Sequence, residues 1–236
     1  MQASTIKTAR GRNPLKASQA VRAEFRRRGK RPGNLTYFYG PKVDRDWVLR
    51  SSLEFAATLD AEASQDVTWY SCDPDSIWCE LSAGGYKGSK PDMIQQRRAA
   101  SRTLVDVSYE HDATHGGRAQ QRRLRESQAS ALGYVWTCYT EEDAMRKQVL
   151  LMNWLAINPV LQQFRRLDVG ALQTEISGLI SVRQGTTVAE VYAAFKLQRA
   201  HVFVALMRAH QRRLLTVEIT RKPFGLATTV VPWSGP

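Results

Sequence analysis

The chain has 236 residues, of which 43% are hydrophobic, and this is enough for one large domain or two smaller ones with a buried core. No apolar stretch reaches the roughly 18 residues that a membrane-spanning helix needs. The basic N-terminus lacks the apolar segment of an export signal. The three cysteines, Cys72, Cys79 and Cys138, form no C-x-x-C pair, which argues against a disulfide scaffold or a four-ligand zinc site. We therefore expect a cytoplasmic protein with no membrane segment.

Positive charge is concentrated at the N-terminal end. The 34 Lys and Arg residues exceed the 22 Asp and Glu residues, for a formal net charge of +12, and residues 1–33 hold only one acid, Glu24. A basic excess favours a polyanionic partner, and nucleic acid is the commonest one in a cytoplasm. We expect residues 1–35 to form a flexible arm that orders on DNA, although tails that bind lipid, acidic proteins or nothing share this composition. The candidate DNA contacts of the arm are Arg26, Arg27, Arg28, Lys30 and Arg31, and Lys90 in the following domain is a further candidate.

Residues 36–140 have the pattern of an α/β domain with a mixed sheet. Ser51 or Ser52 offers an N-cap for a helix that continues to Leu59. A stretch rich in Gln and Arg predicts a second helix over 118–132. Apolar and β-branched runs predict strands over 67–72, 76–81, 91–94, 102–109 and 134–139. A helix, several strands, a helix and a last strand indicate an α/β core.

Residues 141–236 have the plan of an α+β winged helix. Helical periodicity is found over 141–164, with a bend expected at Pro159, and over 169–182, 186–195 and 199–213. Two strand-like runs follow, over 214–220 and 227–233. A helix, a short turn, a helix and a hairpin with a basic tip are typical of a winged helix. Its candidate DNA contacts are Arg199, Arg221 and Lys222, although docking on a protein partner is an equal alternative for this unit.

Three acids are the strongest candidates for chemistry. Glu54 lies on the first predicted helix, Asp92 follows a proline at a strand start, and Asp106 lies on the next strand. If the two strands are neighbours, these carboxyl groups converge and require a hard cation such as Mg²⁺ or Mn²⁺. Such a cation activates water and neutralises charge on a phosphodiester. The alternative is that the three are solvated carboxylates beside turns.

The order and spacing of these motifs resemble the nuclease fold with the motif P-D…(D/E)-x-K. More narrowly, residues 36–220 resemble the TnsA-like endonuclease subunit of heteromeric bacterial transposases. The resemblance is carried by the segments 52–55, 67–77, 91–93, 104–107 and 133–142. It implies a restriction-endonuclease-like core before a winged helix, and an enzyme that uses Mg²⁺ or Mn²⁺ to cut double-stranded DNA at transposon ends. It implies Glu54, Asp92 and Asp106 as the metal ligands, and a DDE-type transposase subunit and an AAA+ regulator as partners.

One catalytic position departs from the family pattern. The motif lysine, two residues after the last acid, is replaced by Ser108, which lacks the positive charge that stabilises the phosphate. A displaced cation such as Lys90, Arg118 or Arg122 is one explanation. A shifted alignment is another, and a domain that binds without cutting is a third. We therefore expect an endonuclease that includes Ser108 in its site. The alternatives are a degenerate nuclease-fold module that binds DNA or protein, and a stand-alone winged-helix regulator.

Overall fold

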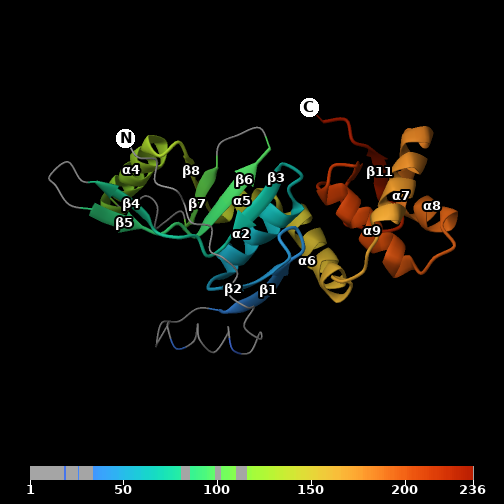
Figure 1. Cartoon of the computed structure of the whole chain (residues 1–236), viewed down its shortest axis with the longest axis horizontal. Helices are drawn as coiled ribbons and strands as arrows, with labels where there is room; N and C mark the ends of the chain where they lie inside the picture. The colour runs from blue at the N-terminus through green and yellow to red at the C-terminus, as the bar shows by residue number, and fades with distance from the viewer. Residues whose placement is uncertain are drawn as a thin grey trace.

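A mixed four-stranded sheet organises the first half of the chain in the computed structural model, which describes residues 34–80, 86–98, 102–109 and 116–235, with Gln19 and Arg26. The strand order is β3 (Val67–Ser71), β6 (Met93–Arg97), β7 (Thr103–Val107) and β8 (Val135–Tyr139). β6 is antiparallel to both of its neighbours, β3 and β7, whereas β8 is parallel to β7. A parallel neighbour needs a crossover, which here contains the helix α4 (Gly116–Ala131). The predicted α/β class with a mixed sheet is confirmed (Figure 1).

Two small antiparallel hairpins accompany this sheet. In one, β1 (Thr36–Gly40) pairs with β2 (Arg45–Leu49), and in the other β4 (Ile77–Glu80) pairs with β5 (Tyr86–Ser89). The first hairpin turns at Asp44, whose φ of 48° is a conformation that Asp tolerates better than most residues. The hydroxyl of Tyr39 donates a 2.7 Å hydrogen bond to the carboxylate of Asp44 and fixes this turn. The sequence analysis did not predict the first hairpin.

Two helices lie against opposite faces of the mixed sheet. The first, α2 (Ser52–Ala63), begins at Ser51, whose hydroxyl accepts the backbone N–H of Glu54 as predicted. Buried residues of α2 pack in the main core together with Val105 of β7. The helix α4 packs its Ala129 against Leu104 in a separate small cluster. Since successive strand residues point to opposite faces, the neighbours Leu104 and Val105 place α4 and α2 on the two sides of β7.

The second half of the chain combines helices with a three-stranded antiparallel sheet. Its helices are α5 (Glu141–Arg146), α6 (Gln148–Gln163), α7 (Gly170–Arg183), α8 (Val188–Ala194) and α9 (Arg199–Gln211). Its strands β9 (Thr186–Thr187), β10 (Leu215–Val217) and β11 (Thr229–Pro232) are arranged in the order β10-β11-β9. The predicted capping box at Thr187 is present, since Glu190 accepts the backbone N–H of Thr187 at 2.8 Å. No helix in the described part of the chain has the length and apolar character needed to span a bilayer.

The predicted helix over 141–164 differs from the observed one. It is divided at Lys147 into α5 and α6, whereas Pro159 lies inside α6. The side chain of Lys147 forms a 2.7 Å ion pair with Asp60 of α2, and α5 has its own capping box at Thr140 and Asp143. The cap of α5 and the tertiary ion pair of Lys147 accompany the break between the two helices, which the continuous apolar pattern did not reveal.

The helix α9 is mostly buried, and its polar side chains bind the rest of the chain. Arg208 donates to the backbone carbonyls of Leu167 and Phe164, at 2.6 and 3.1 Å. Gln211 donates to a carboxylate oxygen of Glu62 at 2.7 Å. These two side chains, which a recognition helix would present to DNA, are thus engaged in intramolecular contacts. Figure 1 shows α6 between the two halves, whose buried hydrophobic residues form one continuous cluster.

A buried carboxylate joins the two halves at the end of α2. Glu62 is fully buried and accepts hydrogen bonds from the backbone N–H of Lys42, the hydroxyl of Tyr70 and the amide of Gln211. Burial raises the pKa of Glu62, and the positive charge of Lys42 opposes this shift. Gly40 is required beside this group, because an added Cβ would lie 2.2 Å from the Tyr70 hydroxyl. The carboxylate is thus held by donors from three separate parts of the chain: the loop after β1, the strand β3 and the helix α9.

His210, on the buried side of α9, makes stability depend on pH. Burial, together with the charge of nearby Lys42, lowers the pKa of His210 to about 4, and the charge of Glu218 opposes this shift. The unfolded chain binds a proton at this group below about pH 6.5, whereas the folded chain does not until about pH 4. Stability from this group is therefore complete above pH 6.5 and is lost as the pH falls. We expect protonation of His210 in the unfolded chain to lower the free energy of unfolding by about 3 kcal/mol between pH 7 and pH 4.

Urea unfolding of the wild type and of His210→Gln at several pH values tests this expectation. The difference between the two unfolding free energies should shrink toward acid pH, because the variant lacks the group that protonates. The contribution of Glu62 cancels in this difference. His201→Gln, at the start of the same helix, is the control and should keep the wild-type pH dependence. Identical pH profiles for His210→Gln and the wild type would contradict the expectation.

Candidate functional site

Glu54 and Asp92 line one small pocket on the α2 side of the sheet. A carboxylate oxygen of Glu54 accepts the backbone N–H of Arg50 at 2.8 Å, and one of Asp92 accepts the backbone N–H of Val107 at 2.7 Å. The pocket is also lined by Leu49, Thr58, Cys72, Met93 and Val107. The structure therefore brings two of the three predicted acids together.

Folding disfavours the ionisation of Asp92. Desolvation by burial raises the pKa of Asp92, and the hydrogen bond from the Val107 N–H opposes the shift. The negative charge of Asp106 raises this pKa further, whereas Arg125 and Arg50 lower it. A partly buried carboxylate near a second acid is a common feature of functional sites, although structural ion pairs also produce it. Asp92 is thus in a site where an added positive charge would be favourable.

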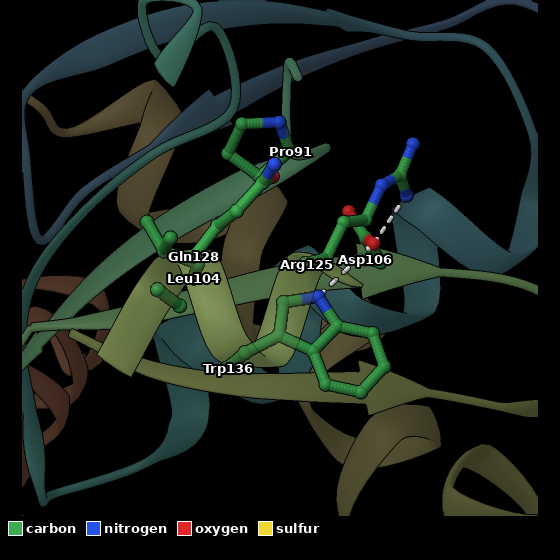
Figure 2. Close-up of a pocket in the computed structure, with 7 residues that line it drawn as sticks. Pro91, Leu104, Asp106, Arg125, Gln128 and Trp136 are labelled. Atoms are coloured by element: carbon green, nitrogen blue, oxygen red, sulfur yellow. Dashed lines mark hydrogen bonds and ion pairs between the residues drawn. The ribbon is translucent and has the colours of Figure 1, made fainter. Parts of the chain in front are cut away.

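Asp106 lines a different pocket, on the α4 side. Its side chain is 8% exposed and forms an ion pair with the guanidinium of Arg125. The indole N–H of Trp136 donates to the same carboxylate oxygen at 3.1 Å (Figure 2). The remaining residues around this pocket are Pro91, Leu104, Gln128 and Ala129. Asp106 therefore already has a cation and a second donor from within the chain.

The alternation of side chains along β7 separates Asp106 from the other two acids. Val105 packs in the core on the α2 side, and Val107 lines the pocket of Glu54 and Asp92. Asp106 lies between them in the sequence and so points to the α4 side. Among the described residues, no group of three or more His, Cys, Asp or Glu side chains is placed to hold a metal ion. The described residues therefore do not fit the expected three-carboxylate site for Mg²⁺ or Mn²⁺.

The residue at the lysine position donates hydrogen bonds to two backbone carbonyl groups. Ser108 donates its backbone N–H to the carbonyl of Tyr139 at 3.1 Å, and its hydroxyl donates to the carbonyl of Tyr109. Of the proposed replacement cations, Lys90 pairs with Asp73 at 2.5 Å and Arg122 donates to the thiol of Cys138 at 2.9 Å. The side chain of Arg118 lies outside the described residues.

The sequence analysis missed Arg125 and Trp136. Arg125 is three residues after Arg122, so both project from the same side of α4. In the register of β7 with β8, Asp106 is paired with Cys138, and Trp136 lies two residues before that cysteine. The spacing of the arginines was therefore a usable signal, but only after the position of α4 over β7 and β8 was known.

The candidate DNA contacts are distributed over several segments. Arg26 is helical and exposed, and Arg199, Arg221 and Lys222 are exposed. Arg199 also lies over the ring of Tyr192, at 6.0 Å from its centroid. The candidates outside the described residues are Arg27, Arg28, Lys30 and Arg31.

Comparison with known proteins does not assign the chain to a family. No protein-family model and no curated protein matches it. Function has to be inferred from the arrangement of the acids, the exposed cations and the order of the elements.

Replacement of Asp92 by asparagine should stabilise the protein at neutral pH. Because burial raises the pKa of Asp92, the folded state disfavours the charge, and this cost grows as the pH rises above the unfolded pKa. Asparagine keeps an acceptor for the Val107 N–H without the charge. We expect a gain of about 0.5–2 kcal/mol at pH 7.5, the usual range for a stabilising substitution.

Thermal and urea unfolding at pH 7.5 and pH 3.5 measure this gain. It should largely disappear at the lower pH, where the wild-type carboxyl group is mostly protonated in both states. Asp75→Asn in an exposed loop is the matched control and should change stability little. Equal or lower stability of Asp92→Asn at pH 7.5 would contradict the expectation.

Proposed function

We propose that the chain is a DNA-binding subunit of a heteromeric transposition complex, with a nuclease-like sheet that does not by itself assemble a cleavage site. The lack of a cleavage site is supported by the ion pair of Asp106 with Arg125, which lies on the opposite side of β7 from Glu54 and Asp92. The serine at position 108 is consistent with the same conclusion, because it supplies no cation beside the acids.

The order of the elements supports a nuclease-like core followed by a winged helix. A helix before a mixed sheet, and a crossover helix into its parallel edge strand, are what the TnsA resemblance leads us to expect of residues 36–140. In the second half, β9 lies between α7 and α8, and a hairpin follows α9. The sheet order β10-β11-β9 is compatible with a winged helix. Such likeness of fold supports a role with DNA but does not by itself assign one.

The DNA contacts we propose are the N-terminal arm and the hairpin loop of the second half. Arg221 and Lys222 are exposed in the loop between β10 and β11, and Asn153 holds this loop through the backbone carbonyl of Lys222 at 2.8 Å. A held loop with two exposed cations is suited to phosphate contact. By the same resemblance, the partners would be double-stranded DNA, a DDE-type transposase subunit and an AAA+ regulator.

A second candidate is the metal-dependent endonuclease that the resemblance implies. It is favoured by the pocket that Glu54 and Asp92 share and by the desolvated carboxylate of Asp92. With Asp106 bound to Arg125, this pocket has only two of the three acids. Cleavage would therefore require either a different third ligand or a rearrangement of β7.

Removal of the loop cations should weaken DNA binding. For Arg221→Ala/Lys222→Ala we expect roughly tenfold lower affinity near 100 mM salt, and a log-affinity versus log-salt slope reduced by about 1–2, because each lost phosphate contact releases about one fewer counterion. Fluorescence anisotropy with a labelled duplex measures both quantities.

The matched control for this double variant is Arg146→Ala/Arg183→Ala, which removes the same charge. Arg146 is already paired with Glu142 and Asp143, and Arg183 is exposed at the end of α7. The control should change affinity by less than about threefold. An equal loss in both double variants would show that net charge, and not the loop, determines binding.

A cleavage assay separates the two candidate functions. We expect duplexes that carry transposon ends to remain uncut in Mn²⁺, both with the chain alone and with any transposase that is encoded beside it. Nicking that requires Mn²⁺ and is lost in Asp92→Ala, with DNA affinity retained, would overturn the binding-only proposal and favour the endonuclease.

A further inference from the structure

The carboxylate of Asp106 is enclosed and needs a counter-ion. Its side chain is 8% exposed, and it lies in β7 beside apolar neighbours that belong to the two hydrophobic clusters. An ionised carboxylate removed from water is unfavourable unless it is paired and hydrogen-bonded. Something on the α4 side therefore has to carry a positive charge.

Arg125 supplies that charge from a fixed position. Its helix packs on the sheet through Ala129, one turn further along the same side of α4. The guanidinium and the Trp136 indole N–H both reach the same oxygen of Asp106, so the carboxylate is bound from α4 and from β8 (Figure 2). The side chain of Arg125 is 38% exposed and lines the pocket on its solvent side.

The surrounding charges also argue against a bound divalent cation. Two guanidinium groups, those of Arg122 and Arg125, face β7 and β8 from α4. The partner of Arg122 is the thiol of Cys138, whose pKa is raised by burial, so this thiol adds no negative charge at neutral pH. A cation approaching Asp106 from this side would be repelled by the two guanidinium groups of Arg122 and Arg125.

From this geometry we propose that Arg125 occupies the position of a metal ion beside Asp106, and that this internal cation keeps divalent metals from the third acid. Asp106 then has a structural role, in which it joins β7, α4 and β8. Asp106 would bind a metal cation only after the guanidinium of Arg125 is removed. The proposal concerns cation binding only and holds whether or not the chain binds DNA.

Direct titration with Mn²⁺, monitored by electron paramagnetic resonance of the free ion, tests the proposal on the full chain. In the wild type, Asp106→Asn should leave Mn²⁺ binding unchanged, because Asp106 contributes no ligand. Arg125→Met should raise Mn²⁺ affinity by roughly tenfold or more, because one unit charge is removed next to a buried carboxylate. Adding Asp106→Asn to Arg125→Met should abolish this gain.

Two further variants keep the test decisive. Arg125→Gln retains a hydrogen-bond donor to Asp106 without the charge, and should give the same gain even if Arg125→Met is poorly folded. Arg123→Met, an exposed arginine of the same helix, should give no gain. Mn²⁺ binding by the wild type that Asp106→Asn abolishes would overturn the proposal, and so would unchanged affinity in folded Arg125→Gln. DNA affinity measured in EDTA is independent of these outcomes, so failure here is distinguishable from failure of the proposed function.

Discussion

The alternation of side chains along β7 determines which acids of this protein lie on the same side of the sheet. Val105 and Val107 must face α2, because the main hydrophobic core lies there. Asp106 is thereby directed to the opposite side, and no small adjustment changes this, since a one-residue shift of register would expose the valines and bury the carboxylate in the core. The separation of Asp106 from Glu54 and Asp92 is therefore as strongly determined as the core itself.

A second constraint is the polar contact between the two halves, which uses the surface that a recognition helix would offer to DNA. Arg208 and Gln211 of α9 satisfy backbone carbonyls and the buried carboxylate of Glu62. Buried polar groups of this kind are costly when one partner is removed. These side chains of α9 are therefore used in contacts within the chain. Exposed cations outside its buried face, such as Arg221 and Lys222, are accessible to a partner.

Local patterns in the sequence were sufficient for the parts of the fold that depend on near neighbours. The caps at Ser51 and Thr187 were predicted because each hydroxyl binds a backbone N–H three residues later. The face of β7 that meets α2 was not predictable, because the path of the chain through the crossover determines which helix covers which face. Arg125 was missed for the same reason: it lies nineteen residues after Asp106 in the sequence and on a different element, α4.

The absent lysine and the unexpected arginine are two parts of one electrostatic arrangement. The nuclease family that the sequence resembles has a lysine two residues after its last acid, beside the carboxylate but free to act on a phosphate. Here Ser108 provides no charge, and the positive charge comes from Arg125 on α4. The local charge balance is thereby preserved, but the guanidinium binds the acid directly and so uses the carboxylate that a metal would need. A substitution at position 108 alone would therefore restore the motif without restoring the site, because Asp106 would remain paired on the other side of the sheet.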